Sequence, residues 1–360
     1  MKIFISTILF MLCGFIAQAQ HFKIRGVVVS DETQEPLQGA SVFMMNTTLG
    51  TVTDDKGNFE IVLPNGGYDV VVTFSGKQSE SRRITTSDGG EKLSFSLKNK
   101  EKELQEVAVV SSSEVKDGWN VYGNFFIDNF IGNTPNAKQT VITNPEVLKF
   151  YYSKRKNKLK VIADAPLSIQ NNALGYTIRY ELDSFVYNYA NHTSLFEGDQ
   201  LFTPIQTSDS AQITKWNEAR ANAYKGSILH FMRSYANKEL EENGFEVRSV
   251  TTVKGVEKTF RIPNPYITLN YQKNDSLQLV ILHPKNPELG ILYTKEKPES
   301  SYSTQFPEEP SDFQYSQISL PAEGLFIESN GYYYDQYDLL INGYWNWTKL
   351  ADMLPYNYQP

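Results

Sequence analysis

Cysteine is nearly absent from this sequence of 360 residues, in which Cys13 is the single example. It lies in the apolar run from Ile3 to Ile16, which follows a lysine and precedes Ala17-Gln18-Ala19. A basic residue, a short apolar run and an Ala-x-Ala site are typical of a secretory signal peptide, so we predict one over residues 1–19. Because cleavage removes Cys13, the mature chain would have neither a disulfide nor a thiolate for catalysis or metal binding.

Long apolar runs and basic clusters are also scarce beyond that segment. No later run is long and apolar enough to cross a bilayer, so we expect no membrane-spanning segment after signal cleavage. The net charge is −7, and the basic residues at 154–160 are better explained as a solvated hairpin turn than as an anion site. We therefore expect no binding to nucleic acid. The sequence predicts a secreted protein, located in the periplasm, on the outer membrane or outside the cell.

Familiar catalytic groupings are missing as well. Zinc peptidases need two histidines and a carboxylate at set spacings, and the four histidines form no His-Glu-x-x-His pattern. Gly226-Ser227 lacks the second glycine of a nucleophile elbow and is better explained as a helix cap. Glu181 and Asp183 share one face of an expected strand, as a glycosidase pair could, although a solvated edge is the simpler interpretation. We expect no enzymatic activity, no cofactor and no metal; a hydrolase using Glu181 or His230 is the least favoured alternative.

The first hundred residues contain a series of short β segments separated by polar turns. The segments are Lys23–Ser30, Ala40–Asn46, Asn58–Leu63, Tyr68–Phe74, Glu80–Thr86 and Lys92–Leu97. This pattern predicts an antiparallel β-sandwich over residues 22–98. In its best-specified turn, Asp54 and Asp55 can accept backbone N–H bonds, and Gly57 can adopt the positive φ that closes the turn. Phe59 then enters the core.

Three stretches of this region resemble the carboxypeptidase-regulatory-like domain: Gly26-Val27-Val28, Glu35–Val42 and Gly50–Phe59. The resemblance implies a transthyretin-like sandwich of roughly seven strands. Such domains are common at the N-terminus of TonB-dependent transporters of the Bacteroidetes, and Leu104–Val110 resembles the segment that joins the domain to the plug there. The resemblance implies a place in the cell envelope and a protein partner, such as an outer-membrane transporter complex.

The rest of the chain is expected to be a linker over residues 99–118 and an uncharacterised α+β domain over residues 119–360. The expected fold class is mainly β, with an antiparallel sheet and one helical hairpin in this second domain. The hairpin would run from Asp209 or Ser210 to Tyr224 and from Ile228 to about Glu242. Strands are expected at Leu148–Tyr152, Leu159–Ala163, Tyr176–Tyr187, Val247–Val250, Thr259–Ile262, Tyr266–Tyr271, Gln278–Leu282 and Gly290–Thr294, and a loop at Pro298–Tyr315. Motifs such as Asn144-Pro145-Glu146 resemble a group of Bacteroidetes secreted proteins with this two-part organisation and no assigned reaction.

Two groups of residues are candidates for ligand binding. On the expected hairpin, the cations, imidazole and rings fall on shared helix faces and could hold an anionic or sugar ligand: Trp216, Arg220, Tyr224, His230 and Arg233. Near the end of the sequence, Tyr344, Trp345 and Trp347 could stack on sugar rings. For the first group, ordinary helix-on-sheet packing with Arg220 paired to a carboxylate is the simpler interpretation. For the second, a protein core or interface is the simpler one.

The sequence therefore favours an envelope-associated binding or assembly module that engages another envelope protein. The alternative is a carbohydrate-binding protein that uses the aromatic residues near its C-terminus, with a glycan as the partner.

Overall fold

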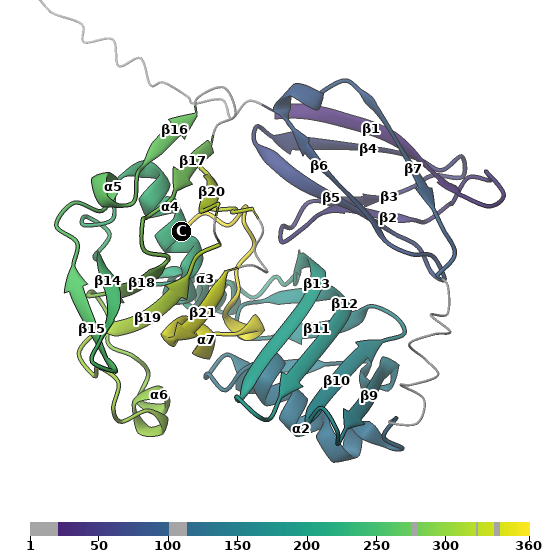
Figure 1. The fold of residues 1–360 in the computed structure, drawn as a ribbon. Helices are drawn as coiled ribbons and strands as arrows, with labels where there is room; N and C mark the ends of the chain where they lie inside the picture. Colours follow the sequence, from purple (N-terminus) through teal and green to yellow (C-terminus); the bar gives the residue numbers. More distant parts are fainter. Residues whose placement is uncertain (1–20, 101–113, 275–278, 322, 335–338) are drawn as a thin grey trace, which may run out of the picture.

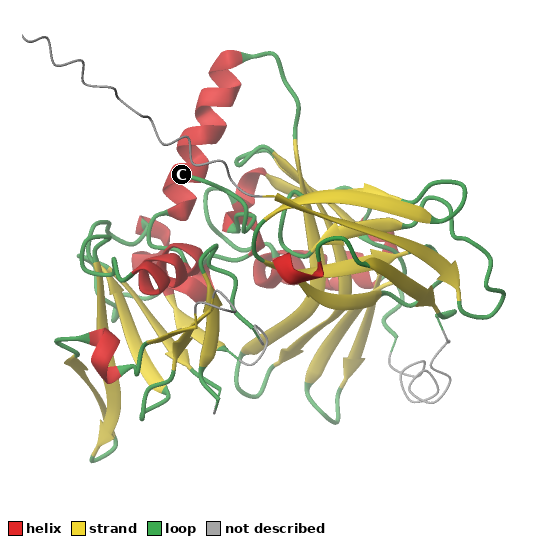
Figure 2. Cartoon of the chain, turned by 90° about the horizontal axis from the view of Figure 1, so that it is seen from above, coloured by secondary structure: helices red, strands yellow, loops and turns green. Residues whose placement is uncertain are grey.

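The computed structural model describes residues 21–100, 114–274, 279–321, 323–334 and 339–360. Within them the chain is mainly β, with several antiparallel sheets and few helices, which confirms the mainly β part of the expected class (Figures 1 and 2). The expected signal peptide over 1–19 and the Leu104–Val110 segment lie outside the described residues. Three large hydrophobic cores divide the described chain into parts that we call the sandwich domain, the middle lobe and the third lobe.

The sandwich domain comprises residues 21–97 and has two sheets around one core. The first sheet has the order β4-β1-β7 and the second the order β3-β2-β5-β6. The strands are β1 (His21–Ser30), β2 (Ser41–Met44), β3 (Gly50–Val52), β4 (Asn58–Pro64), β5 (Gly67–Thr73), β6 (Glu80–Thr85) and β7 (Lys92–Leu97), with the short 3-10 turn η1 (Thr86–Asp88) before the last. All six expected segments are strands, and β3 is an addition.

The two sheets of the sandwich domain differ in what covers them. β1 and β4 alternate between buried and exposed side chains, so one face of their sheet meets solvent. By contrast, β2 is buried at every position and β5 at all but one. Val42-Phe43-Met44 and Val70-Val71-Val72 accordingly have no polar alternation, because the second sheet lies between the sandwich core and the rest of the molecule (Figure 1).

The middle lobe comprises residues 114–227 and is built on one six-stranded sheet. The long strand β12 (Tyr176–Asn188) pairs with β13 (Thr193–Pro204) along one edge and with β11 (Leu167–Asn171) and β10 (Lys158–Ala163) along the other. β8 (Thr140–Ile142) and β9 (Leu148–Ser153) complete the sheet, and η3 (Ala137–Gln139) and η4 (Pro145–Val147) are 3-10 turns. Helix α2 (Gly118–Phe130) places Phe126 and Phe130 in the core, and α3 (Ser210–Tyr224) follows the last strand.

The third lobe begins at α4 (Ile228–Asn237), which packs Phe231, Met232 and Tyr235 into its core. Its larger sheet has the order β15-β14-β18-β19-β21, and its smaller sheet the order β16-β17-β20. The strands are β14 (Phe245–Val253), β15 (Val256–Arg261), β16 (Gln272–Asn274), β17 (Leu279–Leu282), β18 (Glu288–Tyr293), β19 (Gln314–Ser319), β20 (Leu325–Glu328) and β21 (Leu340–Gly343). The short helices are α5 (Pro265–Thr268), α6 (Ser300–Gln305), α7 (Tyr344–Trp347) and the 3-10 turn η6 (Leu350–Asp352).

The helical hairpin lies close to its expected position. The Asp209 carboxylate caps α3 by accepting from Ala211 N and Gln212 N, and the Ser227 hydroxyl caps α4 by accepting from His230 N. α4 ends before the expected Glu242, because Lys238 takes a left-handed conformation with φ 63°.

Three expectations for the second region are wrong. Tyr266–Tyr271 was expected as a strand, but Pro265 starts the short helix α5, with Asn264 as its cap. The expected loop Pro298–Tyr315 contains the helix α6. Helix α2 was not expected, although Tyr122, Phe126 and Phe130 are spaced four residues apart, as one face of a helix requires. Residues 119–360, which we expect as one α+β domain, contain two large hydrophobic cores.

Candidate functional site

The first candidate cluster on the hairpin is a buried packing arrangement. Trp216 is 7% exposed, and its indole N–H donates to Asn172 O at 2.8 Å. The guanidinium of Arg220 donates to Leu174 O at 2.7 Å and lies over the ring of Tyr176, with 4.2 Å from Cζ to the ring centroid. The simpler interpretation expected a carboxylate beside Arg220, but backbone carbonyls take that place.

Tyr224, His230 and Arg233 do come together at the start of α4. The rings of Tyr224 and His230 have centroids 4.6 Å apart, and the guanidinium carbon of Arg233 lies over the Tyr224 ring, 5.4 Å from its centroid. Burial lowers the pKa of His230 to about 4, so the imidazole is neutral near pH 7, and its Nδ1 accepts from Gly226 N at 3.2 Å. His230 Nδ1 is thus occupied by a hydrogen bond within the protein.

Arg233 joins three separate backbone segments. It is 8% exposed, and its Nε donates to Asn330 O at 2.8 Å. Its terminal nitrogen donates to Tyr356 O at 3.0 Å and to Tyr358 O at 2.9 Å. Arg233 therefore holds the segment after η6 against the third lobe.

The aromatic residues near the C-terminus form no exposed platform for a sugar. Tyr344, Trp345 and Trp347 are 7%, 7% and 8% exposed. The indole N–H of Trp345 donates to Gly226 O at 2.6 Å, which ties α7 to the turn between α3 and α4. Tyr344 and Trp345 also line a cavity of about 310 Å³ between the middle and third lobes.

The turn in the sandwich domain has the expected chemistry. The Asp54 carboxylate accepts from Lys56 N at 2.9 Å and from Asn58 N at 2.8 Å. Gly57 has φ 71°, and a side chain there would meet the carbonyl of Val28. Phe59 is 5% exposed and lies in the core. Asp55 is exposed in the same turn.

The proposed hydrolase residue Glu181 is an ion-pair partner of Arg179, with 2.7 Å between nitrogen and oxygen. It pairs in register with Asp199 on β13, and the strand is irregular between Leu182 and Ser184. Burial raises the pKa of Asp199 to about 7, and the carboxylates of Asp183, Glu181 and Asp69 add to the rise. Glu181 therefore belongs to a crowded group of carboxylates with Asp183, Asp199 and Asp69, where the sandwich domain approaches the middle lobe.

This acidic group gives a pH-dependent expectation for Asp199→Asn. Since the folded pKa of Asp199 is raised, its carboxyl contributes stability that is fully present below about pH 4 and is lost as pH rises through about 7. The amide avoids that loss, so the variant should be more stable than the native protein at pH 8 by about 1–2 kcal/mol, after discounting for partial solvent exposure. Urea unfolding at pH 4 and pH 8 tests this; an equal difference at both pH values would contradict it.

The sandwich domain is fixed to the third lobe by a charged contact that sequence reasoning missed. Arg83 forms ion pairs with Glu328 and with Asp69, the latter at 3.4 Å. Its guanidinium lies over the rings of Tyr332 and Tyr334, at 4.3 and 4.8 Å from their centroids. The Tyr332 hydroxyl donates to Asp69, and Glu328 is 5% exposed. We call this group the Arg83 contact.

Backbone hydrogen bonds extend the attachment to the middle lobe and to the segment after η6. Asn46 N donates to Gln200 O at 2.8 Å, and Phe202 N donates to Thr47 O at 2.9 Å. Tyr356 N donates to Asn46 O at 2.7 Å. One sheet of the sandwich domain is therefore occupied by the chain's own second region.

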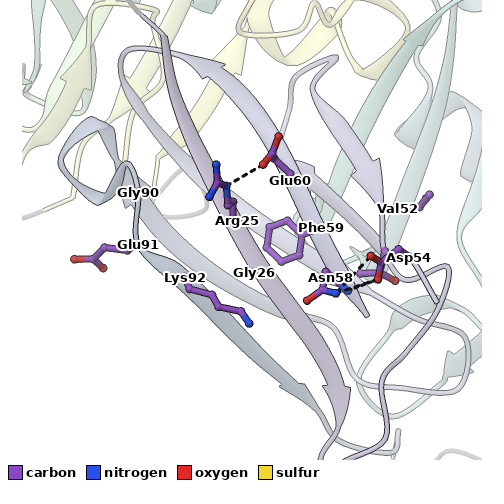
Figure 3. A pocket seen from close by; sticks show the side chains of 11 residues that line it. Arg25, Gly26, Val52, Asp54, Asn58, Phe59, Glu60, Gly90, Glu91 and Lys92 are labelled. Carbon is purple, nitrogen blue, oxygen red and sulfur yellow. Dashed lines mark hydrogen bonds and ion pairs between the residues drawn. The ribbon is translucent and has the colours of Figure 1, made fainter. Parts of the chain in front are cut away.

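The opposite face of the sandwich domain takes part in none of these contacts. It carries an open hollow of about 720 Å³, where the Phe59 ring lies against the backbone at Gly26 (Figure 3). A side chain at Gly26 would overlap that ring. Glu60 accepts from Lys23 at 2.7 Å and from Arg25 at 2.9 Å, and these bonds hold the pKa of Glu60 below its usual value. We call this surface the outer face.

Two structural tests concern metals and membranes. Among the described residues, no group of three or more histidine, cysteine, aspartate or glutamate side chains is placed to hold a metal ion. None of the helices in the described part of the chain is both long and apolar enough to cross a membrane.

Comparison with known proteins identifies the first part of the chain. Residues 24–109 match the family model of the CarboxypepD_reg-like domain. The TonB-dependent receptor SusC of Bacteroides thetaiotaomicron is 32% identical over 115 residues, which are 32% of this chain and 11% of the receptor. The TonB-dependent receptor P3 of Formosa agariphila is 26% identical over 115 residues, 31% of this chain and 11% of the receptor. The chain thus spans about a tenth of the length of these relatives.

Among solved structures, a DUF3823 family protein from Bacteroides ovatus aligns with 52% of this chain and 83% of its own, at 10% identity and a TM-score of 0.19. A likeness of that size supports no conclusion about function. The sequence match, the two-sheet fold and the turn at Asp54 and Gly57 agree for the first part of the chain. Residues 24–109 are a CarboxypepD_reg-like domain of the kind found in SusC-type TonB-dependent receptors.

Proposed function

We propose that this chain is a non-catalytic protein of the cell envelope that binds another envelope protein through the outer face of its sandwich domain. The observation that carries the proposal is the unequal use of the two sheets. The central strands β2 and β5 of the second sheet are covered by the chain's own second region, whereas the β4-β1-β7 sheet keeps an exposed face. The relation of this domain to the N-terminal modules of TonB-dependent receptors supports a partner in the same compartment.

The chemistry of the outer face suits a protein partner better than a charged polymer. Its charges are of both signs, since Lys23 and Arg25 lie beside Glu60 and Lys92 follows Glu91. Phosphate-rich or other polyanionic partners need a surface of one sign. Val62 on β4 is 51% exposed beside these charges, which gives the mixed apolar and polar surface that is common at protein interfaces.

Capture of the partner tests this proposal. The mature protein, tagged and incubated with native envelope extract, should recover one partner in a stoichiometric amount. Val62→Glu places a buried charge in the interface and should reduce that recovery at least fivefold. The matched control is Val256→Glu, which changes a valine that is 60% exposed on β15, far from the sandwich domain (Figure 1).

Two outcomes would contradict the proposal. One is the absence of any stoichiometric partner with the native protein. The other is an equal loss of partner with Val62→Glu and Val256→Glu, because the outer face would then have no special part in binding.

A further inference from the structure

The cavity between the middle and third lobes is built from residues that meet only in the folded chain. Its walls come from the end of α3 and the turn after it, from the segment before α6, from β19, and from α7 and η6. Its volume of about 310 Å³ is at the lower end of the range for small-molecule sites. Since a water molecule occupies about 30 Å³ in the liquid, the space has room for an organic molecule of monosaccharide size.

Gln314 has an unsatisfied acceptor in the wall of this cavity. The residue is 7% exposed, and its Oε1 is buried without a hydrogen-bond partner among the described residues. Its Nε2 donates to Lys297 O at 3.4 Å, and this contact assigns the nitrogen to that end of the amide. Oε1 reaches across to Gly226, where an added Cβ would lie 2.5 Å from it. A buried acceptor without a donor is unfavourable, so a ligand that donates here would remove that penalty.

Three acidic residues line the same space, Glu296, Glu299 and Asp352, and among the described residues the last two have no cation as partner. Asp352 accepts from the Thr134 hydroxyl and from the Asn136 amide, both at 2.8 Å. Glu299 accepts from the Ser301 hydroxyl at 3.4 Å. In the part of the chain that the structure describes, neither carboxyl forms an ion pair. Burial raises the pKa of Asp352 to about 6, with a further contribution from Glu299, and burial also raises the pKa of Glu299.

The lysines that line the cavity are engaged with other carboxylates. Lys225 pairs with Glu296 at 3.4 Å, and Lys297 pairs with Asp312 at 3.3 Å. They do not neutralise Glu299 or Asp352. The lining thus has three acidic residues, Glu296, Glu299 and Asp352, against two lysines. This balance is unfavourable for an anion and favourable for a cation that can donate hydrogen bonds.

We propose that this cavity binds a small organic molecule with a primary ammonium group. The ammonium has three N–H donors, which match Gln314 Oε1 and the carboxylates of Glu299 and Asp352. The rings of Tyr344 and Trp345 in the wall favour a cation over a neutral group of the same shape. A bare metal ion fits less well, because the described residues hold no group of three or more acidic or histidine side chains placed to ligate one.

Matched ligand pairs test the proposal directly. Calorimetric titration of the full mature protein would compare glucosamine with glucose and 1,4-diaminobutane with 1,4-butanediol. At least one amine should bind at least tenfold more tightly than its hydroxyl counterpart. Calcium chloride serves as a separate titrant. Equal binding of both members of each pair, binding of calcium alone, or no binding of either amine at 10 mM would overturn the proposal.

Two substitutions place the binding in this cavity. Glu299→Gln should weaken binding of the amine at least tenfold, while the matched control Glu309→Gln, on the same segment but outside the cavity wall, should leave it unchanged. Gln314→Met removes the unsatisfied acceptor, so it should reduce amine binding while the ligand-free protein keeps or raises its melting temperature. Native binding by both Glu299→Gln and Gln314→Met would place the amine elsewhere and overturn the assignment. None of these residues lies on the outer face, so this result is independent of partner capture.

Discussion

Replacing Arg83 with methionine should lower the free energy of unfolding by about 3–4 kcal/mol. The substitution leaves Glu328, which is 5% exposed, without its cation, and the loss of one partner from a buried pair is strongly destabilising. It also removes the cation from the rings of Tyr332 and Tyr334. Urea unfolding measures the total effect, and hydrogen exchange should show faster exchange in β5 and β20, which carry Asp69 and Glu328.

The matched control for Arg83→Met is Arg25→Met on the outer face. Arg25 pairs with Glu60 at 2.9 Å, but both side chains are about half exposed or more, so the expected effect is below about 1 kcal/mol. The double variant Arg83→Met with Glu328→Gln should recover part of the loss, because the buried charge is then gone. If Arg83→Met proves as mild as Arg25→Met, the Arg83 contact does not hold the domains together.

Arg233→Met is the second substitution for which we expect a large effect, a loss of about 3 kcal/mol. Its three carbonyl partners, Asn330, Tyr356 and Tyr358, would lose a charged donor. A hydrogen bond to a charged group contributes about 1.5–3 kcal/mol net, and water that reaches the freed carbonyls replaces part of the total. We expect the segment over residues 354–360 to be digested by a carboxypeptidase faster than in the native protein.

Arg248→Met is the control for Arg233→Met. It removes an arginine of the same lobe that pairs with Glu246 and lies nearer to solvent. It should cost less than about 1 kcal/mol and leave digestion unchanged. Because Arg233 also fixes Tyr356, whose N–H donates to Asn46, the effects of Arg83→Met and Arg233→Met should not add. Strict additivity of the two losses would show that the two attachments act independently.

Most strands and the main turn of the sandwich domain could be predicted from the sequence, because they depend on residues that are close together in the chain. Alternation along β1 and β4 and the turn at Asp54 and Gly57 depend on neighbours a few residues apart. The same locality explains the position of the capped helices α3 and α4. Helix α2 could have been found from the four-residue spacing of Tyr122, Phe126 and Phe130, but a run of aromatic residues fits a strand equally well.

The contacts between the domains were not predictable in detail, because they join residues far apart in the sequence. Arg83 and Glu328 are 245 residues apart, and no sequence motif around either residue indicates that the two pair. One signal was present: Val70-Val71-Val72 and Val42-Phe43-Met44 are too apolar for strands with a solvated face. That pattern indicates a second covered face without identifying what covers it. No sequence pattern indicated that Gln314, Glu299 and Asp352 line one cavity, because only the packing of the two lobes brings them together.

The link between Thr48 and Asn357 bears on how the protein is made. The Asn357 side chain accepts from Thr48 N at 3.0 Å and donates to the Thr48 hydroxyl, across a separation of 309 residues. A ribosome adds only about 5–20 residues per second, so the first domain must wait many seconds for the residues that dock it. During that interval Phe43 and Val71, which are fully buried in the finished fold on the outer side of its second sheet, have no cover. A protein that escorts the nascent chain would meet these two apolar side chains beside the Asp69 carboxylate before the later lobes cover them.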